Sequence, residues 1–220
     1  MADLLFTGFL DEDLSNVANW DIATGLGVDT ELPAGRVPAV GDTAWLGTDA
    51  NTGSLICDHI YPTNAIGLYG GTYNAIDFVD NDGITLYGVT FNCTFTTNSA
   101  STNFEDGTYN GVVNITSGLE LRNGTFNNTV YLSGASYTTG GTYNGPVVIN
   151  DNGAGTAIGQ GTYNDRVSFD SGYSFLYAVT SSAVAPPNKV LSGTSNLGVP
   201  GTASSGGALV VGSSGSGARF

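Results

Sequence analysis

Positively charged residues are scarce in this chain. Only five of its 220 residues are Lys or Arg, against 19 Asp and Glu, so the formal net charge is −14 at pH 7. Binding to nucleic acid or to an anionic membrane surface depends on Lys and Arg, and an acidic surface repels both. We therefore expect neither nucleic acid nor a membrane among the partners.

Long apolar runs are also missing. No stretch is long enough to span a bilayer, and residues 1–13 lack the basic start of a signal peptide. This pattern predicts synthesis in a cytoplasm without a signal peptide.

The residues that build most catalytic and metal sites are few. The chain has one histidine, His59, and no nucleophile elbow, phosphate loop or metal quartet. We expect no catalytic residue, no metal and no cofactor, and thus a protein that is not an enzyme. Paired carboxylates on neighbouring coils are the enzymatic alternative, but the acids of the repeat region stand at scattered positions: Asp77, Glu105, Glu120, Asp165 and Asp170.

What the chain does contain is a short repeat, Gly-Thr-aromatic-Asn. Five copies match it, and Gly88-Val89-Thr90-Phe91-Asn92 is a variant with one extra residue. The aromatic positions are separated by 18, 18, 17, 17 and 20 residues and fall at Tyr73, Phe91, Tyr109, Phe126, Tyr143 and Tyr163. This period is too short for helical repeats or propeller blades and suits one turn of a β-solenoid. Alternating apolar pairs such as Val113 and Ile115 follow four of the repeats, and clusters of Gly, Asp, Asn and Ser separate the runs.

The fold class predicted from this pattern is all-β. We expect a short parallel β-solenoid of about six to seven three-sided coils, each of 17–20 residues. The expected organisation is an N-terminal docking or capping region at 1–53, the solenoid at 54–180 and a Gly/Ser-rich extension at 181–220.

The repeat also predicts two structural ladders. Within a strand, Thr and Asn point one way and the aromatic residue points the other. The aromatic rings are in phase with the apolar residues that follow, so we expect them to stack inside. The Asn side chains are expected to form a ladder between coils: Asn74, Asn92, Asn110, Asn127, Asn144 and Asn164.

The two cysteines, Cys57 and Cys93, lie 36 residues apart, which is two coils. Two inter-strand spacings give roughly 9–10 Å, beyond the reach of a disulfide. Two free, buried thiols are expected.

The N-terminal region has two interpretations. The first coil of a solenoid exposes an apolar cross-section, and Trp20 and Trp45 could cap it. The segment before them has apolar residues followed by Asp11, Glu12 and Asp13, a pattern that favours docking onto another chain. The docking candidates are Leu4, Leu5, Phe6, Phe9 and Leu10, together with Phe220 in the C-terminal tail, which could instead be a flexible linker.

The order Asn19-Trp20, Pro38 and Gly41-Asp42-Thr43 resembles the lead-in to β-helical regions of phage structural proteins and large bacterial adhesins. The resemblance implies a virion structural protein, such as a bacteriophage capsid decoration or cement protein or a short spike. It further implies location in the virion, partners such as the major capsid protein, and a homo-oligomer, with a trimer favoured.

A surface-recognition module is the alternative function. A flat outward Thr column would favour ice, and an outward aromatic column would favour glycan stacking. The Asx-rich turns at Asp80–Gly83 and Asn150–Gly153 have oxygen ligands suited to Ca²⁺ but lack the rest of an EF-hand loop, so we interpret them as corners.

Overall fold

The computed structural model describes residues 2–24, 27–134, 136–150, 157–158, 161–165, 167–171, 174–176, 190–192, 195–196 and 210–212. The described part is all-β apart from one 3₁₀ helix. Its N-terminal elements are β1 Asp3–Phe6, η1 Val17–Asn19, β2 Trp20–Thr24, β3 Val28–Pro33, β4 Thr43–Leu46 and β5 Ser54–Ile56. No helix among these residues has the length and apolar character needed to cross a membrane.

The remaining strands belong to the coils of the solenoid, which have three short sides from β6 to β23. They are β6 His59–Pro62, β7 Gly67–Tyr69, β8 Thr72–Asn74, β9 Asp77–Asp80, β10 Thr85–Tyr87, β11 Val89–Phe91, β12 Thr94–Thr97, β13 Asn103–Phe104, β14 Gly107–Tyr109, β15 Val113–Ile115, β16 Glu120–Leu121, β17 Thr125–Phe126, β18 Val130–Ser133, β19 Tyr137–Thr138, β20 Thr142–Tyr143, β21 Val147–Asn150, β22 Ala157–Ile158, β23 Thr162–Tyr163, β24 Val167–Ser171, β25 Ser174–Leu176, β26 Val190–Ser192, β27 Ser195–Asn196 and β28 Val210–Gly212.

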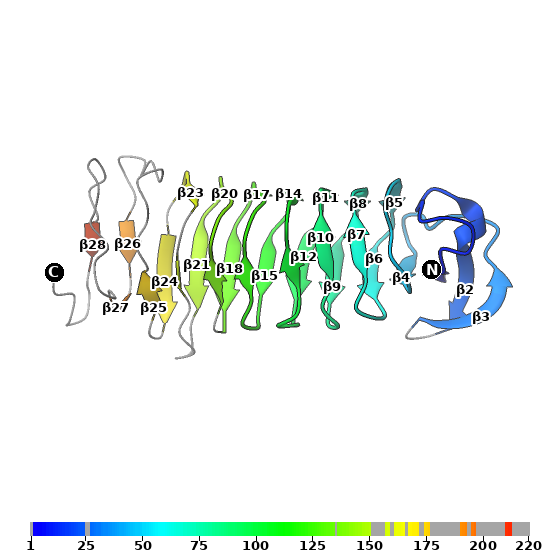
Figure 1. The fold of residues 1–220 in the computed structure, drawn as a ribbon, viewed down its shortest axis with the longest axis horizontal. Helices are drawn as coiled ribbons and strands as arrows, with labels where there is room; N and C mark the ends of the chain where they lie inside the picture. The colour runs from blue at the N-terminus through cyan, green and yellow to red at the C-terminus, as the bar shows by residue number, and fades with distance from the viewer. Residues whose placement is uncertain are drawn as a thin grey trace.

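Each coil contributes one strand to each of three parallel sheets, which confirms the predicted β-solenoid (Figure 1). The first sheet, called sheet A here, contains β6, β9, β12, β15, β18, β21 and their neighbours. Sheet C contains the second strand of each coil, from β7 to β27, and sheet D contains the third, from β5 to β23. Six successive coils, from β6 to β23, have all three strands.

Period-2 alternation decides which side chains enter the core. On sheet A the inward positions of successive coils are filled by Phe78, Phe95, Val113, Val130 and Val147, all buried. Leu68, Leu86, Phe104 and Leu121 do the same on sheet C. Parallel strands that pair residue by residue place like positions above one another, so the core is a set of apolar columns.

The parallel stacking is longer than the expected range 54–180. β4 already pairs with β6 in parallel, so the first coil begins at Thr43. Beyond residue 180, β26 and β28 extend sheet A, and β27 extends sheet C. Triplets such as Val190–Ser192 are enough to add a strand, because each new coil needs to pair only with the one before it.

The glycine that opens the repeat turns the chain at the corner between sheets C and D. Gly71 and Gly141 have φ of 85° and 91°, in the left-handed region that only glycine adopts without strain. A Cβ atom on Gly141 would lie 3.1 Å from the carbonyl oxygen of Gly124 on the preceding coil. The glycine therefore serves both the turn and the close approach of neighbouring coils.

The two cysteines are free and buried, as the coil spacing predicts. Burial is the main cause that raises the pKa of each thiol to about 12. Both side chains therefore pack as small apolar groups and have little thiolate character.

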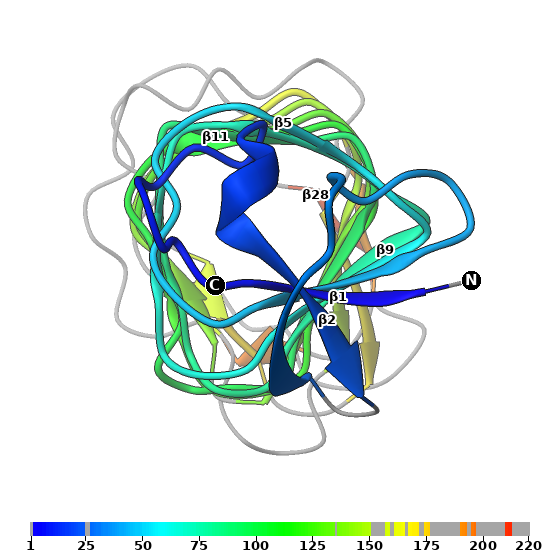
Figure 2. The same cartoon turned by 90° about the vertical axis from the view of Figure 1, so that its right-hand side faces the viewer.

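Three strands and η1 close the N-terminal end of the solenoid, and we call residues 2–33 the cap. Strand β1 lies between β4, with which it is parallel, and β2, with which it is antiparallel. Figure 2 looks onto this end and shows the N-terminal chain crossing the ring formed by the coils. Inside, the rings of Phe6 and Trp20 lie 5.2 Å apart, and the indole Nε1 of Trp20 donates to the Leu14 carbonyl at 2.9 Å.

This arrangement corrects the docking prediction for Leu4, Leu5 and Phe6. All three side chains are buried against their own chain, so they are not available to a partner. The reason is that β1 pairs with β4: Leu4 and Phe6 join the core over the apolar end of the first coil, and Leu5, on the opposite face of the strand, lies over Gly47. Trp45 differs from its predicted capping role as well, because it lies on the outer side of β4 and packs on Tyr61, with ring centroids 5.0 Å apart.

Asp42 ties the cap to the first coil. Its carboxylate accepts hydrogen bonds from the guanidinium of Arg36 and from the backbone N–H groups of Ala2 and Ala39, the last two at 2.9 and 3.0 Å. The hydrogen bond from Arg36 is the main cause that lowers the pKa of Asp42 to about 2. The carboxylate is buried, so its charged form is held by these bonds.

We expect this group to make the stability of the protein depend on pH. The pKa of Asp42 is lower in the folded chain than in the unfolded chain, so its contribution is complete above about pH 4 and is lost as the pH falls toward 2. The loss should be about 2 kcal/mol. Chemical unfolding of the wild type and of Asp42→Asn between pH 6 and pH 2 measures it. Parallel pH profiles for the two proteins would contradict this assignment.

Candidate functional site

The repeat places its aromatic rings in one internal column. The rings of Tyr73, Phe91 and Tyr109 follow one another with centroid separations of 4.9 and 5.6 Å. From Tyr109 through Phe126 and Tyr143 to Tyr163 each step is 4.8 Å, with interplanar angles of 11°, 7° and 6°. Stacked rings of this kind fill the coil interior and fix the spacing between coils.

Three tyrosine hydroxyls in the column have no hydrogen-bond partner among the described residues: those of Tyr73, Tyr109 and Tyr143. Burial raises the pKa of each of them. The hydroxyl of Tyr163 differs, because it lies 2.6 Å from the Thr138 Oγ1. The column is therefore a packing element in which Phe and Tyr occupy equivalent places.

The asparagines of the repeat form a ladder on the outside of sheet D. Each Nδ2 donates to the Oδ1 of the asparagine on the preceding coil, at distances of 2.8, 2.6, 2.7, 2.7 and 2.7 Å from Asn92 to Asn164. The ladder stabilises the stacking of the coils from outside, as the rings do from within.

A column of threonines lies beside this ladder. Successive coils pair Thr72, Thr90, Thr108, Thr125, Thr142 and Thr162 residue by residue. All six are half-buried, and they alternate with the inward rings, so they face outward. The outward threonine array that would favour ice recognition is therefore present, and ice recognition stays a prediction.

The outer face of sheet C carries aromatic and charged side chains, and none of them was predicted as a site from the sequence. Its first two strands end in exposed tyrosines, Tyr69 and Tyr87, which pair with each other across β7 and β10. The sequence does contain a sign of this face, because Tyr69 and Tyr87 are 18 residues apart and each directly follows a leucine that points into the core. That spacing is the coil period, so the two tyrosines occupy paired outward positions on neighbouring coils.

Charged side chains continue this face on the next two coils. Arg122 contacts two carboxylates, with Nη1 3.3 Å from Glu105 Oε1 and Nε 3.1 Å from Glu120 Oε2. Asn103 donates to Glu105 at 2.6 Å, and Thr139 donates to Glu120 at 2.6 Å. The structure thus brings together two of the acids that are scattered in the sequence, and it joins them through an arginine.

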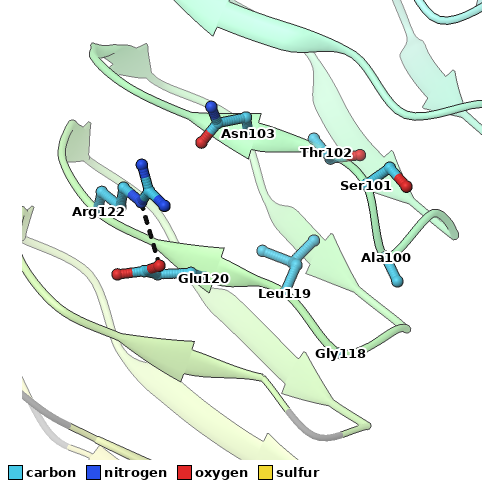
Figure 3. A pocket seen from close by; sticks show the side chains of 8 residues that line it. All are labelled: Ala100, Ser101, Thr102, Asn103, Gly118, Leu119, Glu120 and Arg122. Carbon is cyan, nitrogen blue, oxygen red and sulfur yellow. Dashed lines mark ion pairs between the residues drawn. The ribbon is translucent and has the colours of Figure 1, made fainter.

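A shallow hollow lies on each side of this cluster. One, of about 320 Å³, is lined by Asn103, Glu120, Arg122 and the chain around Ser101 (Figure 3). The other, of about 520 Å³, lies at the corner toward sheet D and is lined by Tyr87, Glu105, Asp106 and Asn123 together with Gly124, Thr125, Gly141 and Thr142.

The other polar candidates have structural partners. The single histidine, His59, pairs with Asp77, with Nδ1 2.9 Å from Oδ1. Asp80 is buried and accepts from Thr97 Oγ1, Thr102 Oγ1 and the N–H groups of its own turn, so it organises a corner. No group of three His, Cys, Asp or Glu side chains suited to a metal ion occurs in the described ranges. Residues 151–153 of the second Asx-rich turn lie outside those ranges.

Two of the predicted docking residues are displayed on the cap. Phe9 is 81% exposed and Leu10 is 63% exposed. The backbone that carries them is held by Asn19, whose side chain is fully buried and whose Oδ1 accepts from the Leu10 N–H at 2.9 Å. Asn19 Nδ2 donates to Asp11 at 2.6 Å, and hydrogen bonds from Asn19, Asp13 and Asn16 lower the pKa of Asp11. Phe220 lies outside the described residues.

Comparisons of the chain with family models, with curated proteins and with solved structures found no match.

Proposed function

We propose that this protein is a non-enzymatic virion structural protein, a bacteriophage capsid decoration or cement protein or a short spike. In this proposal the solenoid is a stiff body, and the cap attaches it to another virion protein such as the major capsid protein. The observation that carries the proposal is the pair Phe9 and Leu10, two large apolar side chains displayed on an ordered loop at one end of the molecule.

The geometry of this loop suits attachment. Burying a Phe and a Leu side chain contributes most of the affinity that a small contact needs. Since Asn19 and Asp11 already fix the loop backbone, little conformational entropy is lost when a partner binds. The exposed carboxylates of Asp11 and Glu12 beside the apolar pair would orient the contact with a basic partner surface.

The shape of the molecule supports the same role. One end of the shaft is closed by the cap, so the coils cannot extend in that direction (Figures 1 and 2). Columns of rings within and asparagines outside connect successive coils, which makes the shaft stiff. We further propose a homotrimer, in keeping with the resemblance to phage structural proteins, and light scattering of the purified protein measures the number of copies.

The experiment is a loading assay on particles purified from the source. We expect mass spectrometry to find the protein in these particles, and we expect purified protein to reload particles from which it has been stripped. The double variant Phe9→Ala/Leu10→Ala should lose about 100-fold or more in affinity, because two apolar side chains no longer become buried. The control is Val40→Ala, which removes an equally exposed apolar side chain elsewhere.

Two results would overturn the proposal. One is the absence of the protein from purified particles. The other is equal loading of the wild type, of Phe9→Ala/Leu10→Ala and of Val40→Ala. The cap would then have no role in attachment.

A further inference from the structure

The outward tyrosines of sheet C form a platform that packing alone does not explain. Tyr69 and Tyr87 are 48% and 57% exposed, so the core gains little from them. The ring of Tyr69 lies over Gly67 on its own strand, where a Cβ atom would be only 2.3 Å from the ring. The glycine thus lets the ring lie against the backbone while its other face meets solvent. Tyr69 and Tyr87 occupy paired positions on neighbouring coils, one after the other along the solenoid axis.

Polar groups with fixed positions adjoin this platform. Going along sheet C, Tyr87 is followed on the next coil by Glu105 and on the one after that by Arg122. Glu105 uses one oxygen, Oε1, to accept from both Asn103 and Arg122. Its other oxygen accepts no hydrogen bond from any described residue. The cluster is therefore held in place, while one carboxylate oxygen of Glu105 has no hydrogen-bond donor among the described residues.

The same face is hollowed where these groups meet. Tyr87, Glu105, Asp106 and Asn123 line the hollow of about 520 Å³ together with Gly124, Thr125, Gly141 and Thr142, and the two glycines leave room where side chains would otherwise stand. An aromatic side chain, carboxylate acceptors, an amide and threonine hydroxyls beside open glycine backbone suit a ligand with an apolar face and a rim of hydroxyl groups. A hexose ring has both, because its axial C–H groups form an apolar face and its hydroxyls lie around the edge.

The charges decide which sugars fit. The hollow carries the carboxylates of Glu105 and Asp106, while the charge of Arg122 is already shared with Glu105 and Glu120. The chain as a whole has a net charge of −14. An acidic sugar would be repelled, and a neutral one would not.

We propose that the outer face of sheet C binds a neutral oligosaccharide that lies along the solenoid axis. Tyr69 and Tyr87 stack against successive hexose rings, and Glu105, Asp106 and Asn123 bind the hydroxyls of the ring that occupies the hollow. The three coils from Tyr69 to Glu105 span two inter-strand spacings, roughly 10 Å, so the site takes a short stretch of a glycan chain. Sheet D suits this ligand less, because its outer columns offer threonine and asparagine with no aromatic face.

The test uses the full-length protein and a panel of neutral hexasaccharides: maltohexaose, cellohexaose, mannohexaose and chitohexaose. Polygalacturonate hexamer is the acidic comparison. Saturation-transfer NMR and calorimetry should detect binding of at least one neutral member. Tyr87→Ala should weaken that binding about tenfold or more, whereas Tyr87→Phe, which keeps the aromatic face, should bind within about threefold of the wild type.

Tyr131→Ala is the matched control, because Tyr131 is an exposed tyrosine on the outer face of sheet A. It should bind like the wild type. Circular dichroism checks that each variant keeps the fold, which is expected because these side chains lie on the surface. The proposal is overturned if no neutral hexasaccharide binds at millimolar concentration, if only the acidic hexamer binds, or if Tyr87→Ala binds as tightly as Tyr131→Ala. The loading assay above is independent of these results, so each proposal can fail alone.

Discussion

Replacing Phe126 by Ala is expected to lower the free energy of unfolding by about 3–5 kcal/mol. Phe126 is fully buried in the middle of the aromatic column. Its ring stacks on Tyr109 and on Tyr143, in both cases with centroids 4.8 Å apart, so truncation removes contacts to two coils at once. Because each coil rests on its neighbours, the cavity cannot be filled without breaking the register of the strands on both sides.

Chemical denaturation of the purified variant measures this effect. Tyr131→Ala is again the control, since it removes an aromatic ring that stands on the outer face of sheet A, and it should change the free energy of unfolding by less than about 1 kcal/mol. If Phe126→Ala were no more destabilising than Tyr131→Ala, the internal column would not be what holds the coils together.

Replacing Phe6 by Ala should cost about as much, 3–5 kcal/mol. The side chain of Phe6 is fully buried in the cap, where it contacts Trp20, and β1 pairs with β4 through Phe6 and Leu46. Removing the ring opens the apolar end of the first coil to water. The measurement is again denaturant unfolding, and an increase in the binding of a hydrophobic dye at low denaturant would report the opened end.

Phe9→Ala is the matched control within the same segment. Phe6 and Phe9 are three residues apart, but Phe9 is 81% exposed, so its removal should leave the stability within about 0.5 kcal/mol of the wild type. Phe6→Ala should therefore affect folding, and Phe9→Ala should affect attachment. Equal stability losses for the two variants would show that residues 7–13 belong to the core of the cap, and the docking role of Phe9 would be lost with that result.

The coil architecture was predictable because it depends on local, repeated features. The recurrence of Gly-Thr-aromatic-Asn sets the length of a coil, and the two-residue period of a strand puts Tyr143 inside and Asn144 outside without reference to the rest of the chain. Parallel stacking then follows, since equal coils bring equal residues into register. The prediction that Cys57 and Cys93 are free and buried rests on the same coil period, which places them two coils apart.

The tertiary structure decided what no local pattern encodes. In the sequence alone, the apolar residues Leu4, Leu5 and Phe6 are typical of a docking segment. They are buried because β1 pairs with β4, and in this register Asp3 stands opposite Thr43, forty positions later in the chain. In the same way, Glu105 and Glu120 stand at different places in the repeat, and the register of β13 and β16 brings both within reach of Arg122. The sequence determined the period and the inside of the solenoid, because these depend on neighbouring residues. The pairing of strands that are distant in the sequence decided which apolar residues stay exposed and which charged side chains meet. Only the folded chain brings these strands together.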